Sequence, residues 1–452
     1  MVKTAQQTLA GWGNYPRVAC EVARPETTKD LHALLTAQPD GGLLARGLGR
    51  SYGDPAVSDT GVVVDCTRLD CYRDFDPDTG LLTCEAGVSL EMILRDFAPR
   101  GFMPMITPGT KFVTVGGCIA NDIHGKAHHV DGCFSQCTES FKILLADGRH
   151  LTASPTENAD LYWANFGGMG LLGIITEATI RLRPIDTTFF RQRGITVPNL
   201  DALFDALDEY HHMPYSVAWI DSMATGADMG RGVLTVGDHA TIRDLGHKQQ
   251  RNPLAVSPPS PLVLPFEMPS GALNTTTIRL LNVVLEQVQK RASPISHYEG
   301  FFYPLDFIDK WNRGYGARGF CQYQFVVPME NGRQNVRELL EMVSTSGQAP
   351  FLNVFKKFGA ERPETMLSFP FEGYTFAIDF PVRDGLQDLL RRMDQRVVQM
   401  GGRVYLGKDA FLERDLFEQM YPRLDQWRAI KAKYDPHNRF TSNLGRRLGL
   451  CD

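Results

Sequence analysis

Residues 108–125 read PGTKFVTVGGCIANDIHG, and this stretch does most to decide the fold. Glycine lets the backbone approach a ligand because it has no Cβ, and threonine hydroxyls can donate hydrogen bonds to phosphate oxygens. On both sides of the stretch, short β-branched runs alternate with glycine clusters, a pattern typical of strands joined by turns. The stretch therefore predicts a ligand-binding loop within a strand-rich α+β domain.

Two more glycine clusters lie in the same region, RGLGRSYGD at 46–54 and FGGMGLLG at 166–173. The first resembles the G-x-G-x-x-G pattern of nucleotide-binding βαβ units, but its spacing is one residue too long. Pro55 also disfavours the helix that must follow that pattern. The segment can still turn backbone N–H groups toward an anion. One such loop is often an ordinary turn, but three of them indicate a large ligand spread across the domain.

Length and composition limit the possible functions. A chain of 452 residues is too long for one hydrophobic core, since domains usually split near ~250 residues. The 47 basic and 52 acidic residues give a net charge of -5, so no positive field exists to hold nucleic acid. Nine scattered cysteines, an odd number, favour reduced thiols and a cytoplasmic location. No stretch approaches the ~20 apolar residues of a membrane span, although peripheral attachment at the inner membrane surface stays open.

Helical periodicity is expected in five stretches, at 89–101, 158–167, 199–210, 272–292 and 385–402. In the first of them, Ser89 is a suitable N-cap and Gly101 a stop signal. Residues 403–407, RVYLG, are expected to form a strand. Residues 251–271, RNPLAVSPPSPLVLPFEMPSG, are too rich in proline for a regular element. We interpret this last segment as a flap that orders on an apolar ligand, with a plain surface loop as the alternative.

Cys133 and Cys137, with His128 and His129 just upstream, raise the alternative of a metal site. Zinc sites normally combine one closely spaced ligand pair with a second, separated pair, and the sequence has no second pair. We therefore expect no metal, and we interpret the two cysteines as small buried residues.

The three glycine stretches, together with DPHNRF at 435–440, resemble the vanillyl-alcohol-oxidase type of FAD-dependent oxidoreductases. The likeness continues through FFYPLDFIDKWNRGYGARGF at 301–320, QYQFVVP at 322–328 and YLGKDAF at 405–411. Within that group, the branch that oxidises polyprenylphosphoryl ribose is the most similar.

This resemblance implies an α+β fold with three parts. A two-part PCMH-type FAD-binding domain would occupy residues 1–186. An α+β substrate domain with an antiparallel sheet would occupy residues 187–402, and residues 403–452 would return to the first domain.

The resemblance also assigns FAD binding, chiefly to the first two glycine loops. Many family members attach the flavin to a histidine at the position of Arg50, so bound but unlinked FAD is implied here. Ile175 would lie along the adenine. The implied FAD-binding residues are Arg46, Gly47, Leu48, Gly49, Arg50, Ser51, Tyr52, Gly109, Thr114, Val115, Gly116, Gly117, Asn121, Asp122, Ile123, His124, Ile175 and Tyr405.

The resemblance also implies which residues bind the substrate and which take part in catalysis. A lysine suits a place beside flavin because a cation near N1 stabilises the negative charge that develops when hydride reaches N5. The oxidation of an alcohol also releases a proton, and the sequence does not choose its acceptor among the catalytic candidates. Those candidates are Lys408, Tyr405 and His124. The implied substrate-binding residues are Gln322, Gln324, Lys356 and Lys408.

The implied activity is oxidation of the C2 hydroxyl of a polyprenyl-phosphate-linked ribose to the 2-keto sugar. A separate short-chain NAD(P)H-dependent reductase would then complete the epimerisation to arabinose for cell-envelope glycans. The alternatives are a soluble aldonolactone or alditol oxidase of the same fold and a non-catalytic flavin-binding subunit. The apolar residues 252–271 favour the lipid-linked substrate, because a soluble polyol oxidase has no use for them.

The sequence departs from this family at Ala377, where members sensitive to covalent inhibitors carry a cysteine, and at Thr375, which replaces an asparagine. A thiol has no necessary step in hydride transfer. We therefore expect catalysis to survive and sensitivity to thiol-directed inhibitors to be lost.

Overall fold

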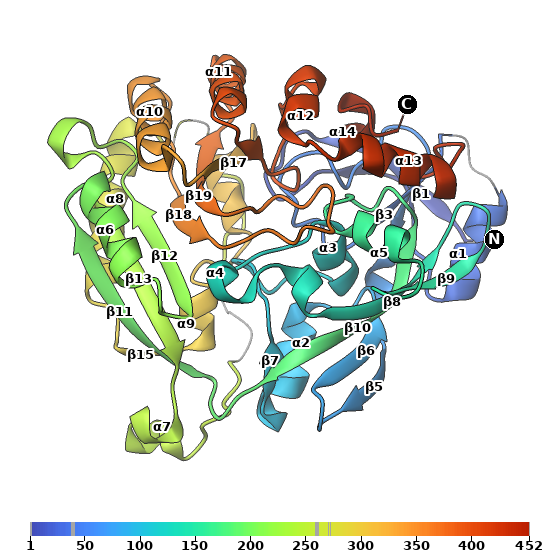
Figure 1. The fold of residues 1–452 in the computed structure, drawn as a ribbon, viewed down its shortest axis with the longest axis horizontal. Coiled ribbons are helices and arrows are strands. Elements are labelled where there is room, and N and C mark those ends of the chain that lie inside the picture. Colours follow the sequence, from blue (N-terminus) through green and yellow to red (C-terminus); the bar gives the residue numbers. More distant parts are fainter. Residues whose placement is uncertain (1, 38–40, 258–261, 270, 272, 452) are drawn as a thin grey trace.

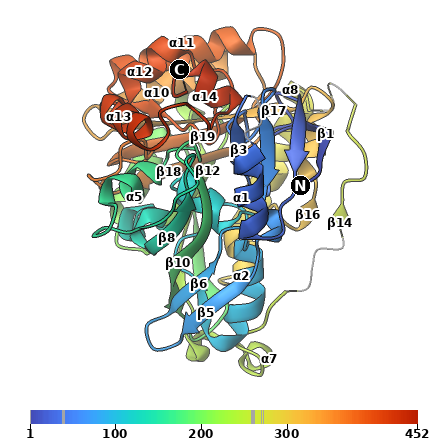
Figure 2. The same cartoon turned by 90° about the vertical axis from the view of Figure 1, so that its right-hand side faces the viewer.

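The structure is a computed structural model that describes residues 2–37, 41–257, 262–269, 271 and 273–451. Three main sheets follow one another along the chain, with helices on their outer faces (Figure 1). Figure 2 shows the C-terminal helices stacked above the N-terminal strands.

The first sheet has the order β1-β2-β4-β3, in which β2 and β3 are both parallel to β4. Helix α1 covers one face, because Leu31, Leu34 and Leu35 pack with Leu43 and Val62 of the strands. The elements are β1 (Thr4–Leu9), β2 (Val18–Ala23), α1 (Thr28–Ala37), β3 (Leu43–Arg46) and β4 (Val62–Asp65).

The second sheet is antiparallel and is organised around the long strand β10, which pairs with β6, β7 and β8. Its order is β5-β6-β10-β8-β9. Apolar residues of the strands, such as Phe141 and Ile180, form one core with Ile93 of α2 and Ile119 of α3. The elements are β5 (Tyr72–Asp76), β6 (Leu81–Glu85), α2 (Leu90–Phe97), β7 (Phe102–Pro104), α3 (Val115–Ala120), α4 (His128–Asp131), β8 (Thr138–Leu144), β9 (His150–Ala153), α5 (Ala159–Asn165) and β10 (Ile174–Pro184).

The third sheet has eight strands in the order β15-β11-β13-β12-β18-β19-β17-β20, and neighbouring strands are antiparallel. One face packs Leu234, Phe325 and Phe355 against helices α6, α10 and α11. The opposite face is turned toward the N-terminal half. The elements are β11 (Phe189–Val197), α6 (Leu200–Glu209), β12 (Tyr215–Ile220), β13 (Gly232–His239), α7 (His247–Gln250), β14 (Leu262–Val263), α8 (Thr275–Lys290), β15 (Ile295–His297), α9 (Tyr298–Phe302), β16 (Ile308–Asp309), β17 (Phe320–Pro328), α10 (Gly332–Thr345), β18 (Asn353–Phe358), β19 (Gly373–Pro381), α11 (Leu386–Gln399) and β20 (Arg403–Val404).

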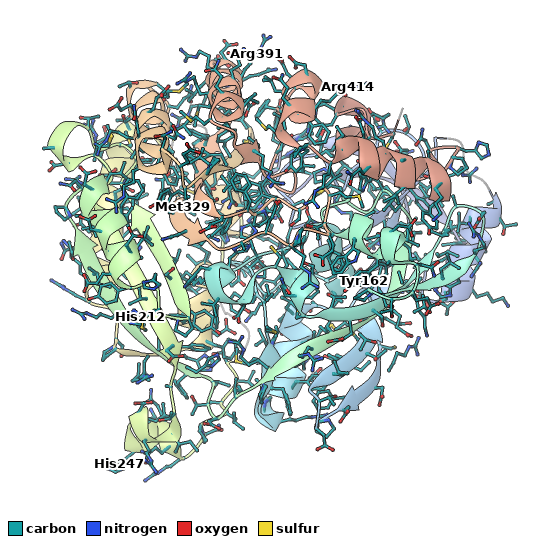
Figure 3. All side chains as sticks on the ribbon, in the orientation of Figure 1. Tyr162, His212, His247, Met329, Arg391 and Arg414 are labelled. Atoms are coloured by element: carbon teal, nitrogen blue, oxygen red, sulfur yellow. The ribbon has the colours of Figure 1, made fainter. Side chains whose placement is uncertain are left out.

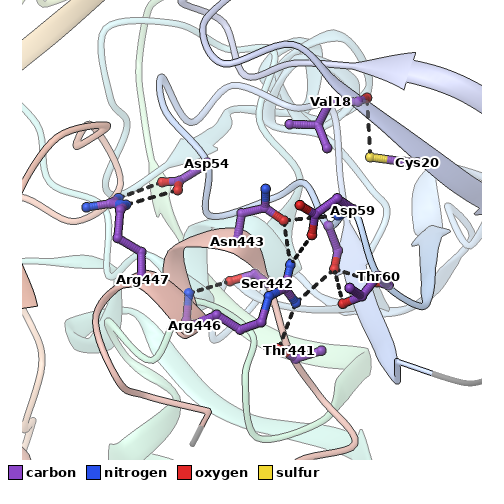
Figure 4. A network of polar contacts seen from close by, with 12 residues as sticks. Val18, Cys20, Asp54, Asp59, Thr60, Thr441, Ser442, Asn443, Arg446 and Arg447 are labelled. Carbon is purple, nitrogen blue, oxygen red and sulfur yellow. Dashed lines mark hydrogen bonds and ion pairs between the residues drawn. The ribbon is translucent and has the colours of Figure 1, made fainter.

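The C-terminal segment packs back on the N-terminal half through α12 (Arg414–Met420), α13 (Leu424–Tyr434) and α14 (Asn443–Arg447). The indole N–H of Trp427 donates to the Ala164 carbonyl at 2.9 Å. Arg447 forms two hydrogen bonds with the carboxylate of Asp54, and Arg446 contacts Thr441 in the same network (Figure 4). Because Asp54 directly follows the first glycine loop, this network ties that loop to the end of the chain.

The five expected helices are confirmed as α2, α5, α6, α8 and α11. Ser89 caps α2 by accepting a hydrogen bond from the Met92 N–H at 3.1 Å. The strand expected over 403–407 is wrong beyond Val404, because the chain turns there and the Lys408 N–H bonds to the Tyr405 carbonyl at 3.0 Å. Within 251–271, a two-residue strand, β14, pairs with β16, and residues 258–261 and 270 lie outside the described part of the chain.

Candidate functional site

The first glycine loop leaves β3 and runs against the second. A Cβ on Gly47 would stand 2.2 Å from the Thr114 hydroxyl oxygen, so only glycine permits this approach. Gly49 has a φ of 64° in the left-handed region. The backbone N–H groups of residues 48–51, from Leu48 through Gly49 and Arg50 to Ser51, donate no hydrogen bond to any described residue. Four consecutive donors without a partner on a half-buried loop are available to bind an anion.

The second glycine loop begins α3. The Thr114 hydroxyl accepts a hydrogen bond from the Gly117 N–H at 3.2 Å and caps the helix, while the Gly116 N–H bonds to the Ala86 carbonyl at 2.8 Å. Val115 is fully buried beneath the loop. A Cβ on Gly109 would meet no atom within 4 Å, so this glycine lies beside open space.

The third glycine cluster has a packing role. The Met169 N–H bonds to the Ala120 carbonyl at 2.9 Å, and a Cβ on Gly167 would clash with the Leu367 carbonyl at 2.3 Å. This loop therefore supports the end of α3 from behind. Ile175, which follows it on β10, is buried and pairs with Ile143.

Three of the expected FAD-binding side chains are engaged elsewhere. Arg46 donates to the carbonyls of Ala10 and Ala56, both at 2.7 Å, and so fixes the first loop. The buried carboxylate of Asp122 accepts from the Ser135 N–H at 2.9 Å and from Ser368. The buried Ile123 is held by backbone bonds to Cys118 and Phe134. These residues shape the loops from inside the protein.

A turn in the C-terminal segment brings Tyr405 and Lys408 to the two loops. The Tyr405 hydroxyl donates to the Asn121 carbonyl at 3.0 Å, and the Tyr52 N–H donates to the Gly407 carbonyl at 3.1 Å. The ammonium of Lys408 lies 5.6 Å from the centre of the Tyr52 ring. Burial raises the pKa of Tyr405 well above its usual range.

The third sheet supplies the opposite wall. Gln322 faces Asp379 and Gln324 faces Ala377 across β17 and β19, so all four share one face of the sheet. Lys356 of β18 lies on the same face, because it pairs with Thr375 of β19. Three of the four expected substrate-binding residues therefore share one face of the third sheet, and the fourth, Lys408, lies on the C-terminal turn beside Tyr52.

His124 joins the two halves. It is 5% exposed, and its Nε2 lies 3.2 Å from the amide nitrogen of Gln324. The His124 ring also packs 5.3 Å from that of Tyr405. Burial, reinforced by the charge of Lys356, holds the pKa of His124 well below its usual range. At neutral pH the imidazole is therefore uncharged.

Asp379 is a further residue of the site, and none of the sequence motifs indicated it. Its buried carboxylate accepts hydrogen bonds from the Gln322 amide and, at 3.2 Å, from the Tyr315 hydroxyl. Burial raises the pKa of Asp379, and the positive charge of Lys408 partly offsets this rise. Burial lowers the pKa of Lys408, and the negative charge of Asp379 partly offsets this fall. The two groups form no direct ion pair. The available signal was a single aspartate in an otherwise apolar strand, GYTFAIDFP, since a buried charge often marks a functional site.

The site lies inside a densely packed molecule. Figure 3 shows Arg391 and Arg414 on outer helices, whereas Tyr162 lies within the N-terminal half. At the centre, three buried polar atoms have no hydrogen-bond partner among the described residues: His124 Nδ1, Gln322 Oε1 and Gln324 Oε1. Buried polar atoms are costly without partners. With the free N–H groups of residues 48–51 for a pyrophosphate, these atoms fit a flavin dinucleotide and a hydroxylated substrate.

Comparison with protein families agrees with this geometry. The FAD binding domain family matches residues 21–154, and the D-arabinono-1,4-lactone oxidase family matches residues 318–448. The protein is an FAD-dependent oxidoreductase with a PCMH-type FAD-binding domain.

Individual relatives define the family more closely. Decaprenylphosphoryl-β-D-ribose oxidase of Mycolicibacterium smegmatis is 37% identical over 99% of this chain and 98% of its own length. L-gulono-1,4-lactone dehydrogenase of Mycobacterium tuberculosis is 22% identical over 97% of this chain and 98% of its own. D-arabinono-1,4-lactone oxidase of Yarrowia lipolytica is 30% identical over 41% of this chain and 36% of its own. The chain belongs to the decaprenylphosphoryl-β-D-ribose oxidase family of flavoproteins.

Among the helices that the structure describes, none is both long enough and apolar enough to cross a bilayer. The nine cysteines are free thiols, and Cys133 and Cys137 are buried as small core residues.

Proposed function

We propose that the protein oxidises the C2 hydroxyl of a ribose that is joined through phosphate to a polyprenyl chain. The observation that carries this proposal is that Lys408 lies beside Tyr52 of the first glycine loop, while Asp379 shares one face of the third sheet with the glutamines of β17. The likeness to decaprenylphosphoryl-β-D-ribose oxidase supports the same substrate, because it extends over both walls of the site. When bound, FAD accepts the hydride from the sugar carbon.

Lys408 is the group best suited to accept the hydroxyl proton. Burial lowers the pKa of its amine, so a neutral fraction is present near neutral pH. Tyr405 is a poor base because its pKa is raised and its hydroxyl already donates to Asn121. His124 is a weak base because its pKa is strongly lowered. Once protonated, Lys408 becomes a cation that the nearby Asp379 carboxylate stabilises.

The remaining polar groups orient the sugar. The free Oε1 atoms of Gln322 and Gln324 can accept hydrogen bonds from sugar hydroxyls. Gln322 is itself fixed by its bond to Asp379, and Gln324 by a bond of 3.0 Å to Thr375. Fixed acceptors of this kind hold the reacting C–H bond in one orientation.

The lipid-linked substrate requires contact with a membrane, and α8 supports such a contact. Leu280, Val283, Val284 and Val288 are 67%, 53%, 51% and 62% exposed, and their spacing places them on one side of the helix. The exposed Arg291 follows this apolar stripe, which suits an anionic lipid surface. We place the protein peripherally at the inner membrane surface, on the cytoplasmic side that its nine free thiols favour.

A separate short-chain NAD(P)H-dependent reductase is the proposed partner, because the 2-keto sugar must be reduced to give arabinose.

A second candidate function is the oxidation of a free aldonolactone or alditol. The match to the D-arabinono-1,4-lactone oxidase family over 318–448 supports it.

One experiment separates the two functions. The purified holoenzyme is mixed anaerobically with farnesylphosphoryl-β-D-ribose, with free pentoses and alditols, or with aldonolactones, and the visible flavin band is followed. Bleaching by the lipid-linked ribose supports the first function. Bleaching by the free compounds alone would establish the second, and binding to vesicles that contain phosphatidylglycerol tests the membrane contact.

A further inference from the structure

Two lysines at the edge of the site take no part in the proton transfer described above, although the family resemblance implies substrate binding for Lys356. Lys126 directly follows His124 and Gly125, and Lys356 extends from β18 toward the same residues. The Lys126 ammonium donates to the Phe301 carbonyl and lies 4.7 Å from the centre of the Phe301 ring. The Lys356 ammonium lies 3.5 Å from the Gly125 carbonyl oxygen. The two amines therefore flank one short stretch of backbone.

Among the residues that the structure describes, neither amine has a counter-ion. Lys111, Lys357 and Lys431 each pair with a carboxylate, whereas within the described residues no carboxylate oxygen lies within 4.0 Å of Lys126 or Lys356. Both residues retain part of their exposed surface. Burial of cations without a partner is unfavourable, and it lowers the pKa of Lys126 to about 8 and that of Lys356 to about 7.

A third donor lies on the same face of the sheet. Trp219 of β12 pairs with Val354, two residues before Lys356, so its side chain and that of Lys356 point to the same side. Trp219 is 7% exposed, and its indole N–H has no acceptor among the described residues. The two amines and the indole N–H thus add three donors on this side of the site, beside the Gly125 and Phe301 carbonyls.

We propose that Lys126 and Lys356 form a subsite for the phosphodiester of the lipid-linked sugar, with Trp219 as a further donor. This inference rests on the proposed function, because it assigns the phosphate of that substrate. Thr375 faces Lys356, and Asp379 lies four residues further along β19, which corresponds to about 13 Å. A lysine side chain and a phosphoribosyl group together span such a distance. The subsite would therefore hold the ribose with its hydroxyls near Lys408 and Asp379.

The test compares two ligands that differ only in the phosphate. Farnesylphosphoryl-β-D-ribose and the neutral farnesyl β-D-riboside are given to the wild-type holoenzyme and to Lys126→Met and Lys356→Met variants. Lys357→Met is the matched control, because Lys357 neighbours Lys356 but pairs with Asp208. We expect each methionine variant to raise KM for farnesylphosphoryl-β-D-ribose about tenfold or more, with little change in kcat. The KM for the neutral farnesyl riboside should change little. Lys356→Arg, which keeps the charge, should retain most of the affinity.

A measurement of binding alone tests the phosphate subsite without any turnover. Calorimetry with farnesyl phosphate and the holoenzyme should show weaker binding by both methionine variants and unchanged binding by the control. Equal losses on both ribose ligands, or full affinity of both variants for farnesyl phosphate, would overturn the subsite. If farnesyl phosphate binds in the expected way but no ribose ligand bleaches the flavin, the proposed function fails and the phosphate subsite stands.

Discussion

The hydroxyl of Tyr405 donates a hydrogen bond of 3.0 Å to the backbone carbonyl of Asn121. These residues are 284 positions apart, and the bond joins the C-terminal turn to the end of α3. The same turn carries Gly407, whose carbonyl accepts the Tyr52 N–H of the first glycine loop. The arrangement of the two glycine loops therefore depends on a segment close to the C-terminal end of the sequence.

Tyr405→Phe should loosen FAD binding because it removes this bond. The variant leaves the buried carbonyl without its partner, at a cost of about 1 to 3 kcal/mol. Release of flavin during dilution, followed by fluorescence, should be faster than in the wild type. Tyr421→Phe is the control, since Tyr421 makes a similar bond of 2.7 Å to the Val404 carbonyl. Equal flavin retention by both variants would show that the bond only stabilises the fold.

Asp379→Asn should shift the pH dependence of flavin reduction to lower pH. The Asp379 carboxylate raises the pKa of Lys408, which burial otherwise lowers. Without the carboxylate, Lys408 loses its proton at lower pH, and the rate depends on its neutral form. The acid limb of the rate profile, measured by anaerobic stopped flow, should therefore lie at lower pH than in the wild type. Asp384→Asn is the control, because that side chain is 97% exposed. A shift to higher pH would exclude Lys408 as the base.

Gly109→Ala should weaken FAD binding without changing the stability of the apoprotein. A Cβ at this position meets no protein atom within 4 Å and requires no left-handed backbone. Any effect must then come from a bound group. Thermal melting of the apoprotein and titration with FAD measure the two quantities separately. Gly314→Ala, with its nearest atom at 4.0 Å, serves as the control. Unaltered FAD affinity would place the cofactor away from Gly109.

Lys431→Met should destabilise the protein strongly. Lys431 is 4% exposed and pairs with the fully buried Asp435, so the variant leaves an unpaired buried carboxylate. The expected loss is about 3 to 5 kcal/mol in the free energy of unfolding. Lys433→Met removes an exposed pair with Asp160 and should cost less than about 1 kcal/mol. Urea unfolding of both variants tests the difference, and similar midpoints would contradict it.

Local features of the sequence predicted much of the fold. The helices α2, α6 and α11 follow from apolar periodicity, and the Ser89 cap and Gly101 stop act within one or two turns. Helix caps and apolar periodicity can be predicted from the sequence because they depend only on residues that are close together along the chain. The strand expected over 403–407 failed for the opposite reason. The chain turns after Val404, and this turn is held by the distant Tyr52, whose N–H donates to the Gly407 carbonyl.

The site was predicted in part. The first two glycine loops have free donors or open space, whereas the third cluster packs behind α3, and glycine spacing alone could not separate these roles. Asp379 and Lys126 were missed, because an isolated Asp or Lys in a sequence is usually an exposed side chain. Both residues gain their significance from burial and from partners in other elements.

The sequence by itself determined where the helices and turns form, which loops can approach a phosphate, and which family the chain resembles. These properties depend on backbone sterics and short-range periodicity. The tertiary structure alone decided that Lys408 and Asp379 lie near each other and that Lys126 and Lys356 have no counter-ion among the described residues. Charge and pKa depend on burial and on distances between elements, and only folding sets the burial of these groups and the distances between them.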